Sequence, residues 1–260
     1  MVWMSFFIIL PSLLILFLAI TNFDLYLKGP FEFTLEAFKV FRQSTVQIAL
    51  TNSIKFSFIT TMIALIIGYP TAYYLAHLKT DYKTFLVALI IIPVWSNMLL
   101  RIIAWEKLFF PISLLNMFGL SLDWIGSDKA IIIGMLSMYL PFMILPIYSV
   151  LVKLDKHLIE AAKDLGASAF QTFIRVVLPL SLPGVVSGII MTLLPAMTTF
   201  ALPERLGGGK VILIGNVIED AFMKTGNLNV GSMISIVLML VIVLLFIGVM
   251  RVDKEGETLV

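Results

Sequence analysis

The residues best suited to chemistry lie in one polar stretch, 154–184, between two long apolar segments. Glu160 carries a carboxylate that can form charge-assisted hydrogen bonds with a cationic partner. Ala161 and Ala162 follow it, and their small side chains allow close approach in a cleft. Gly166 can set the angle between two helices, because glycine adopts backbone conformations that other residues avoid. These residues suit contact with another protein.

The first half of this stretch has the pattern of a short amphipathic helix. Asp155 is a plausible N-cap, and Gly166 suits the C′ position, where a positive φ is needed. The apolar face consists of residues at helical spacing, Leu158, Ile159, Ala162 and Leu165. We therefore expect a helix that ends at Gly166.

A second amphipathic helix is predicted to follow Ala167. Ser168 and Gln171 have the spacing of a capping box. We expect Pro179 to end this helix, because the residue before a proline is biased away from the α region. The apolar face would consist of Phe170, Phe173, Ile174 and Val177. This pattern fits two interpretations, a helical hairpin lying on the membrane surface or an element that docks to a partner protein.

The sequence excludes several other kinds of site. The chain has no cysteine, which excludes thiol catalysis and thiolate metal sites, and its two histidines, His77 and His157, are far apart. The stretch 207–210 lacks the first glycine and the final hydroxyl residue of a P-loop. We found no paired acids or serine–histidine couple in the apolar segments that would indicate an intramembrane enzyme. We expect no metal or other cofactor in this chain.

The segments that must position this stretch are apolar enough to require a membrane. Hydrophobic residues make up 60% of the chain and charged residues 13%, against roughly 25% charged in soluble proteins. A membrane span takes about 20 mainly apolar residues. Six such spans are predicted, at about 2–21, 48–76, 85–110, 130–152, 182–201 and 231–250. The predicted fold is an all-α integral membrane protein with one transmembrane domain over 1–260.

Prolines and basic residues refine this prediction. Pro93 should break the third span, and the prolines in other spans suggest kinked helices around a pathway. The loops 77–83 and 153–180, with the tail from Arg251, are richer in Lys and Arg for their length than the opposite loops. This asymmetry places them, and both termini, in the cytoplasm. The opposite loops carry several acids, among them Glu204, Glu219 and Asp220, and we interpret most of the acids in these loops as ordinary solvated charge.

The 154–184 stretch resembles the EAA motif of ABC importer permeases. Glu160-Ala161-Ala162, Gly166, and Val176 with Leu178-Pro179 match the motif at its fixed spacing. The resemblance implies a type I ABC importer permease fold of six transmembrane helices, whose cytoplasmic coupling helices over 154–180 sit in a cleft of an ATPase subunit. ATP and Mg²⁺ would bind to that subunit. The implied coupling residues are Glu160, Ala161, Ala162, Gly166, Ala167, Ser168 and Pro179.

Other motifs resemble the PotB-type branch of this family, the permeases of bacterial spermidine/putrescine importers. The stretches 52–54 and 68–73 resemble the permease core. The stretches that resemble the PotB type are 92–97, followed by Arg101 and 104–105, then 194–197 through 207–208, and 214–218. The branch implies a bacterial cell membrane, a second PotC-like permease, two PotA-like ATPase subunits and a PotD-like extracellular binding protein. Importers of other organic cations and of 2-aminoethylphosphonate share parts of these motifs and remain alternatives. The net charge of +2 is too small to indicate nucleic acid.

A polyamine is an extended cation with apolar methylenes, so its pathway should offer carboxylates and aromatic faces. The candidate pathway residues are Tyr73, Trp95, Arg101, Trp105, Thr199, Phe200 and Glu204. Each aromatic could instead face lipid, and Trp95, beside Pro93, is the best exception. Arg101 is costly inside a span unless it is paired, and Glu106 is a local partner. Glu204 could bind substrate or pair with Arg101 or Arg205.

An ion-coupled secondary transporter is the alternative from another class. Such transporters often carry acids in mid-membrane, whereas the predicted spans hold few, and an EAA-like stretch would have no purpose in them. Six spans are too few to enclose a wide pathway comfortably. We therefore expect the route to lie at the interface with the second permease.

Overall fold

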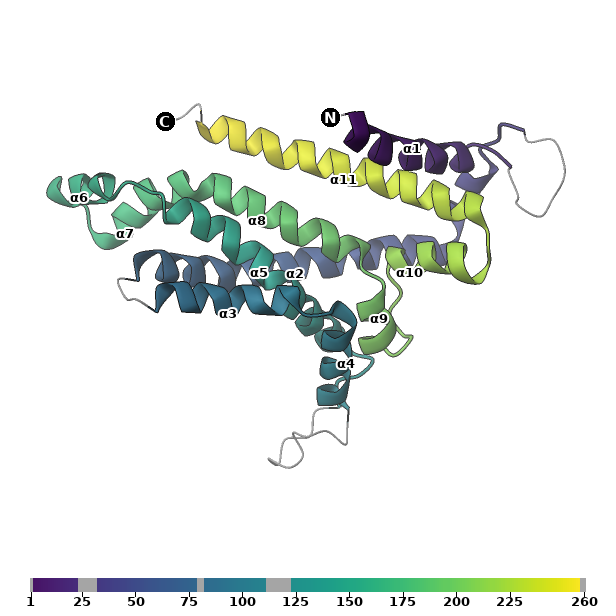
Figure 1. The fold of residues 1–260 in the computed structure, drawn as a ribbon, viewed down its shortest axis with the longest axis horizontal. Helices are drawn as coiled ribbons and strands as arrows, with labels where there is room; N and C mark the ends of the chain where they lie inside the picture. Colours follow the sequence, from purple (N-terminus) through teal and green to yellow (C-terminus); the bar gives the residue numbers. More distant parts are fainter. Residues whose placement is uncertain (1, 23–31, 79–81, 111–122, 258–260) are drawn as a thin grey trace.

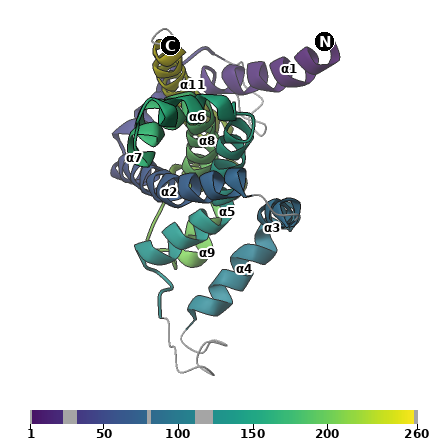
Figure 2. The same cartoon turned by 90° about the vertical axis from the view of Figure 1, so that its left-hand side faces the viewer.

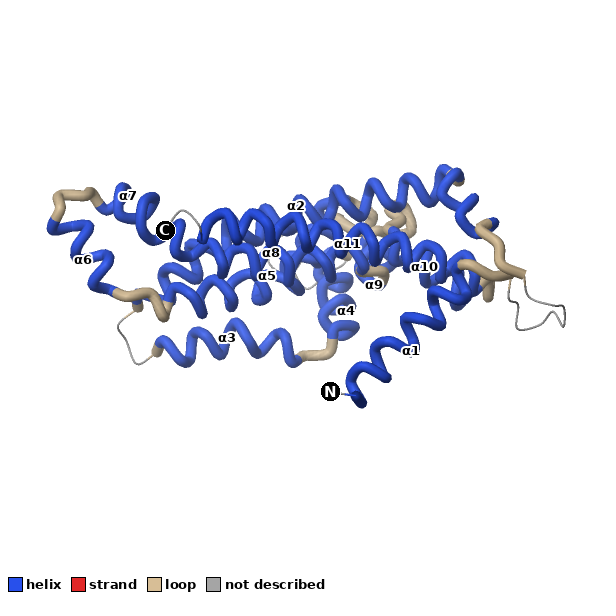
Figure 3. Tube along the Cα trace, turned by 90° about the horizontal axis from the view of Figure 1, so that it is seen from above, coloured by secondary structure: helices blue, strands red, loops and turns tan. Residues whose placement is uncertain are grey.

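Long apolar helices dominate the structure, because a backbone in hydrocarbon must satisfy its hydrogen bonds within its own segment. The structure is a computed structural model that describes residues 2–22, 32–78, 82–110 and 123–257. Its long helices run side by side along the longest axis of the molecule (Figures 1 and 3). The short helices lie mainly at the two ends of this bundle.

Three long helices form the centre of the bundle: α2 (Ser44–His77), α5 (Asp128–Leu151) and α8 (Leu178–Thr198). Glycines allow α8 to lie directly against α5. A Cβ atom added to Gly184 would lie 3.0 Å from the carbonyl oxygen of Pro146, and one added to Gly188 would lie 3.0 Å from that of Met143. Small residues promote such close helix packing in membranes, where apolar burial alone gives little driving force.

A second layer consists of α1 (Val2–Ala19) and α11 (Leu228–Glu257), which pack on each other along one side of the bundle. In Figure 2, α11 is seen end-on and α1 runs across the view, and both lie on the side opposite the arm formed by α4 (Met98–Phe109) and α9 (Ala201–Leu206). The Asn229 side-chain amide donates hydrogen bonds to the carbonyl groups of Leu18, at 3.1 Å, and Thr21. One polar side chain thus joins the start of α11 to the end of α1.

The third predicted span is bent. Helices α3 (Lys83–Trp95) and α4 (Met98–Phe109) meet at 94°. The prediction that Pro93 breaks the span is wrong in detail, because α3 continues through Pro93 to Trp95. The break falls at 96–97, where Ser96 Oγ donates to the Pro93 carbonyl and the Asn97 side chain accepts from the Leu99 amide at 2.8 Å. These side chains replace helical backbone bonds and permit the corner.

The predicted number of six spans is not matched in full. Among the described residues, four helical stretches are long and apolar enough to cross a membrane, 44–77, 128–151, 169–198 and 228–248. The bent pair α3 and α4 can make a fifth. The apolar stretch 6–19 of α1 is shorter than a full span.

Short helices lie at both ends of the bundle (Figure 1). Helices α6 (Lys156–Asp164) and α7 (Ala169–Thr172), with the π-helix η3 (Phe173–Val177), lie near the end of α2 that contains His77. Towards the opposite end lie the 3-10 helix η1 (Glu36–Arg42), α9 (Ala201–Leu206), α10 (Ile214–Glu219) and the π-helix η4 (Asp220–Lys224).

Candidate functional site

The predicted first coupling helix is present as α6. The Asp155 side chain accepts a hydrogen bond from the His157 amide at 3.0 Å, which confirms the N-cap. Gly166 has a φ of +81°, which confirms the predicted C′ conformation. The Gly166 amide donates to the Lys163 carbonyl, and the Ala167 amide to the Ala162 carbonyl. These two bonds form a Schellman motif that ends the helix.

The second helix begins as predicted and continues further than predicted. The capping box between Ser168 and Gln171 is confirmed, with both reciprocal hydrogen bonds formed. Leu178, however, has helical φ and ψ of −63° and −49°, so the expectation that Pro179 ends this helix is wrong. We attribute the continuity to η3, since the wider π turn avoids the clash between a proline ring and a carbonyl one turn back. The segment 169–198 is thus one helical rod.

The hairpin formed by α6 and α7 leaves apolar side chains uncovered within this chain. Leu165 is 88% exposed and Phe170 is 72% exposed. Glu160 is also exposed, and its Oε2 lies 3.5 Å from His157 Nδ1. A cleft of about 310 Å³ lies on the hairpin and is lined by Ala162, Leu165, Gly166, Ala167, Gln171, Thr172, Arg175 and Val176. Of the small residues of the predicted motif, Ala162, Gly166 and Ala167 line this cleft.

Aromatic contacts join the hairpin to the bundle. The Phe173 ring packs edge-on to both Tyr69 and Tyr73 of α2, with 5.7 Å between ring centroids in each case. The Tyr69 hydroxyl is 2.7 Å from the Ser181 hydroxyl in α8. Tyr73, which we expected in the substrate pathway, therefore lies beside the hairpin, whereas Thr199 and Phe200 lie beyond the far end of α8.

Helix α4 contains two more of the predicted pathway residues, Arg101 and Trp105. Trp105 stacks on Phe109, with 5.2 Å between centroids. Glu106 lies 3.8 Å from Arg205. Among the described residues, Arg101 forms no ion pair with Glu106, and Glu204 forms none with Arg101 or Arg205, the two pairings that the sequence left open. In the described residues, Nε and Nη1 of Arg101 are buried and have no hydrogen-bond partner. Helix α4 is thus joined to α9 by a different ion pair than predicted.

The remaining predicted residues separate into two places. Trp95 is 87% exposed at the end of α3 and contacts little of this chain. Thr199, Phe200 and Glu204 lie together at the corner between α8 and α9, where Thr199 is buried and the other two are exposed. The structure therefore brings Thr199, Phe200 and Glu204 together. Trp95, at the end of α3, and Tyr73, beside the hairpin, are not part of this group.

Polar side chains fix the backbone around this corner. The Ser53 hydroxyl accepts a hydrogen bond from the Ile214 amide at 2.8 Å, and the Asn52 amide donates to the Ile212 carbonyl at 3.1 Å. The Asn216 amide donates to the Phe200 carbonyl at 2.9 Å. These bonds connect α2, α10 and the start of α9, and they hold α10 against the end of α8.

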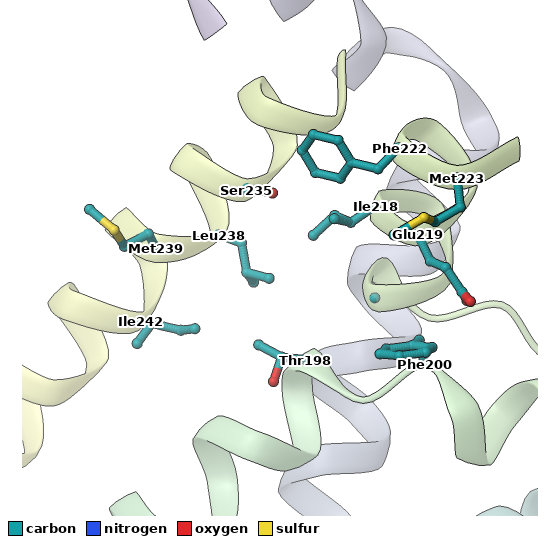
Figure 4. Close-up of a pocket in the computed structure, with 11 residues that line it drawn as sticks. Thr198, Phe200, Ile218, Glu219, Phe222, Met223, Ser235, Leu238, Met239 and Ile242 are labelled. Carbon is teal, nitrogen blue, oxygen red and sulfur yellow. The ribbon is translucent and has the colours of Figure 1, made fainter. Parts of the chain in front are cut away.

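A cavity of about 460 Å³ lies beside this corner, between α8, α10, η4 and α11 (Figure 4). Phe200 lines it, as do Glu219 and Phe222. Glu219 is an exception to the interpretation of most of the acids in the opposite loops as ordinary solvated charge, because its side chain is partly buried and its Oε2 has no hydrogen-bond partner among the described residues. Burial, together with nearby Glu204, raises the pKa of the Glu219 carboxyl, whereas Lys224 lowers it. In the sequence, the only indication of this environment is that Glu219 and Asp220 stand together in an otherwise apolar stretch.

Comparison with known proteins identifies the family. Residues 64–253 match the family described as binding-protein-dependent transport system inner membrane component. The chain belongs to this family. The permease is 39% identical over 97% of its length to the spermidine/putrescine transport system permease protein PotB of Haemophilus influenzae, covering 91% of that protein. It is 36% identical, again over 97% of its length, to PotB of Escherichia coli K12, covering 94% of it.

Solved structures support the fold of the permease. A chain of a bacterial ABC transporter that imports the acidic polysaccharide alginate aligns with a TM-score of 0.79 at 14% identity, over 98% of the permease and 92% of that chain. A chain of the MetNI methionine transporter aligns with a TM-score of 0.63 at 17% identity, over 82% of the permease and 96% of that chain. At such identities, the alignments establish the all-α ABC permease fold. They say nothing about the substrate.

Proposed function

We propose that the chain is a transmembrane permease subunit of an ATP-driven importer of polyamines such as spermidine or putrescine. The observation that carries this proposal is the 39% identity to PotB of H. influenzae over nearly the whole chain. The alginate and methionine transporters share the fold at 14–17% identity. The substrate class therefore follows the PotB relatives.

The hairpin of α6 and α7 is the proposed site of coupling to the ATPase. A surface that docks into another protein should be apolar, exposed and preorganised, and Leu165 and Phe170 meet the first two conditions. The capping box and the Gly166 turn supply the third condition. Glu160 lies at the edge of this surface, where a cationic group of the ATPase can bind it.

The proposed assembly contains a PotC-like second permease, two PotA-like ATPase subunits and a PotD-like extracellular receptor. The hairpin would face the cytoplasm, with both termini on the same side. The loops around His77 and around α6 lie at one end of the bundle, while α10 and η4 lie at the opposite end (Figure 1). The basic loops therefore share an end, in accordance with the positive-inside rule.

Co-purification and ATPase assays test the proposed function. The chain should co-purify with its ATPase and partner permease, and receptor loaded with spermidine or putrescine should stimulate ATP hydrolysis by the reconstituted complex. Loaded receptors for methionine and alginate serve as controls. Stimulation by one of these, with none by polyamines, would overturn the assignment of substrate class.

The coupling role has a separate test. A double variant, Glu160→Lys with Gly166→Pro, should abolish spermidine uptake, because it reverses the charge at the hairpin edge and prevents the positive φ of the turn. The matched control is Glu36→Lys, which reverses an exposed carboxylate in η1. Uptake at the wild-type rate by the double variant would refute a coupling role for the hairpin.

Glu204 is a proposed contact for the substrate ammonium groups. It is exposed beside Phe200 at the end of the bundle away from the hairpin. Glu204→Gln should weaken the spermidine-stimulated ATPase activity of the complex, because a charge-assisted hydrogen bond contributes about 1.5–3 kcal/mol. An unchanged dependence on spermidine concentration would count against this contact.

A further inference from the structure

The cavity beside Phe200 has the dimensions of a ligand site. Its volume is about 460 Å³, within the roughly 300–1,000 Å³ typical of small-molecule pockets. Its walls come from four elements that follow one another closely along the chain, and side chains of α8, α10, η4 and α11 point toward it (Figure 4). Gly215 contributes to this shape, because a Cβ there would lie 2.5 Å from the Thr198 carbonyl oxygen.

The hydroxyl protons of the cavity wall are used within the chain, whereas the Glu219 carboxylate lacks a donor. The Thr198 hydroxyl donates to the carbonyl groups of Leu194 and Pro195, and the Ser235 hydroxyl donates to that of Gly231. Glu219 Oε2 is buried, and no described residue donates a hydrogen bond to it. A buried carboxylate oxygen without a partner is costly, so its retention indicates a group that arrives from outside this chain.

Charges near Glu219 favour a cation. Glu204 and Asp220 lie close enough to raise the pKa of the Glu219 carboxyl. Lys224 is the neighbouring cation, but its Nζ is held 2.6 Å from Asp220 Oδ1. Glu219 therefore lies in a negative environment with its nearest lysine already paired. An incoming ammonium group would relieve the repulsion and supply the missing donor.

The rest of the cavity suits the methylene part of such a cation. Phe200 and Phe222 lie across the cavity from each other, and the Glu219 carboxylate is on the side of Phe200 (Figure 4). Most other lining side chains are aliphatic or methionine, such as Met239. Aromatic faces attract ammonium groups, and the aliphatic wall removes methylenes from water.

We propose that this cavity is a binding station for an alkylammonium cargo, with Glu219 as the acceptor for one ammonium group and Phe200 and Phe222 as aromatic walls. The inference rests on the proposed function. It places a transient binding site for the transported cation at the end of the bundle opposite the hairpin. A lipid acyl chain would fill the apolar part of the cavity and leave Glu219 Oε2 without a donor. The carboxylate therefore favours a cation over lipid.

The cysteine-free sequence permits a direct test. In the full reconstituted complex, Met239→Cys places the single thiol of this chain on the cavity wall, and its rate of modification by a small thiol reagent is measured with and without spermidine. Spermidine should slow modification, and Glu219→Gln should weaken this protection about tenfold, the loss of one charge-assisted hydrogen bond. Glu219→Asp should retain part of the protection. Tyr82→Cys, exposed and outside the cavity, should show no protection.

Each alternative outcome has a distinct meaning. Equal protection by neutral 1,8-octanediol, or undiminished protection in Glu219→Gln, would overturn the cation site and indicate an apolar crevice for lipid. If Met239→Cys fails to assemble, spermidine uptake by Glu219→Gln is compared, in the native background, with uptake by Glu36→Gln, which neutralises an exposed carboxylate outside the cavity. Similar uptake by the two variants would overturn the proposal. Failure of the proposed function is recognised separately, because the wild-type complex would then not transport spermidine.

Discussion

At the scale of single residues, Gly166 has a positive φ that disfavours other residues, although there is room for a side chain at this position. Its φ is +81°, and a Cβ there would have no neighbour within 4 Å. Substitution therefore acts through backbone strain, which costs an ordinary L residue about 1–2 kcal/mol. The geometry of the hairpin depends on this one conformation.

Gly166→Val should lower the number of spermidine molecules imported per ATP hydrolysed, because strain displaces α6 from α7. Gly166→Asn should preserve much of the coupling, since asparagine tolerates a positive φ. Gly209→Val is the matched control, because Gly209 has a φ of +73° and open space but lies far from the hairpin. Equal behaviour of the Val and Asn variants at 166 would contradict this account.

Glu219 should make the folded chain less stable as pH rises. Burial and nearby Glu204 raise its pKa above the ordinary value of 4.5, so the folded chain binds this proton more tightly than the unfolded chain. The carboxylate then destabilises the folded state as pH rises through the folded pKa. Glu219→Gln should therefore raise the apparent Tm at neutral pH.

A pH series of thermal unfolding in detergent checks this expectation. The gain in Tm from Glu219→Gln should vanish below the ordinary pKa of glutamate, where the carboxyl is protonated in both states. Glu36→Gln is the control of opposite sign, because the hydrogen bond from Lys39 lowers the pKa of Glu36. A gain in Tm that persists at acidic pH would show that the charge is not its cause.

At the scale of elements, the hairpin continues into α8 through the π-helix η3. The rod 169–198 can transmit movement of the hairpin without an intervening loop. Two phenylalanines of this rod have different surroundings. Phe173 packs on Tyr69 and Tyr73 of α2, whereas Phe170 is 72% exposed. The first should hold the hairpin to the bundle, and the second should contact the ATPase.

Alanine variants separate these two roles. Phe173→Ala should destabilise the isolated permease by about 2 kcal/mol, less than a fully buried phenylalanine. Phe170→Ala should change its stability by less than about 0.5 kcal/mol but reduce co-purification of the ATPase. Thermal unfolding and pull-down of the same preparations provide both measurements. A large loss of stability in Phe170→Ala would show that this ring packs on its own chain.

At the scale of the whole molecule, close contact between α5 and α8 holds the core together. Gly188 lies against Met143, whose carbonyl oxygen would be 3.0 Å from an added Cβ. Gly188→Leu should separate the two helices at a cost of at least about 1–3 kcal/mol, as overpacking does. The yield of monodisperse protein and its apparent Tm should both fall.

Gly248→Leu is the matched control, because a Cβ there meets nothing within 4 Å. It should leave the yield and the Tm close to wild type. Similar losses in both variants would mean that a bulky residue harms these helices wherever it is placed, and that close packing at Gly188 has no special role.

The sequence by itself determined the class of the protein and the local shape of the hairpin. The apolar composition requires a membrane, and the Asp155 cap, the Gly166 turn and the Ser168–Gln171 capping box are short-range features that neighbouring residues decide. The EAA pattern is likewise local, and it was enough to indicate the transporter family that the comparisons establish.

Only the tertiary structure decided which distant residues meet. Pro93 and Pro179 were expected to interrupt helices, yet both lie within helices. At Pro179 the π-helix η3 relieves the clash of the proline ring, and near Pro93 the corner falls at 96–97 instead. Arg205 pairs with Glu106, and Glu219 borders a cavity built from four elements. Such contacts depend on how separate helices pack, and spacing along the chain carries no information about that packing.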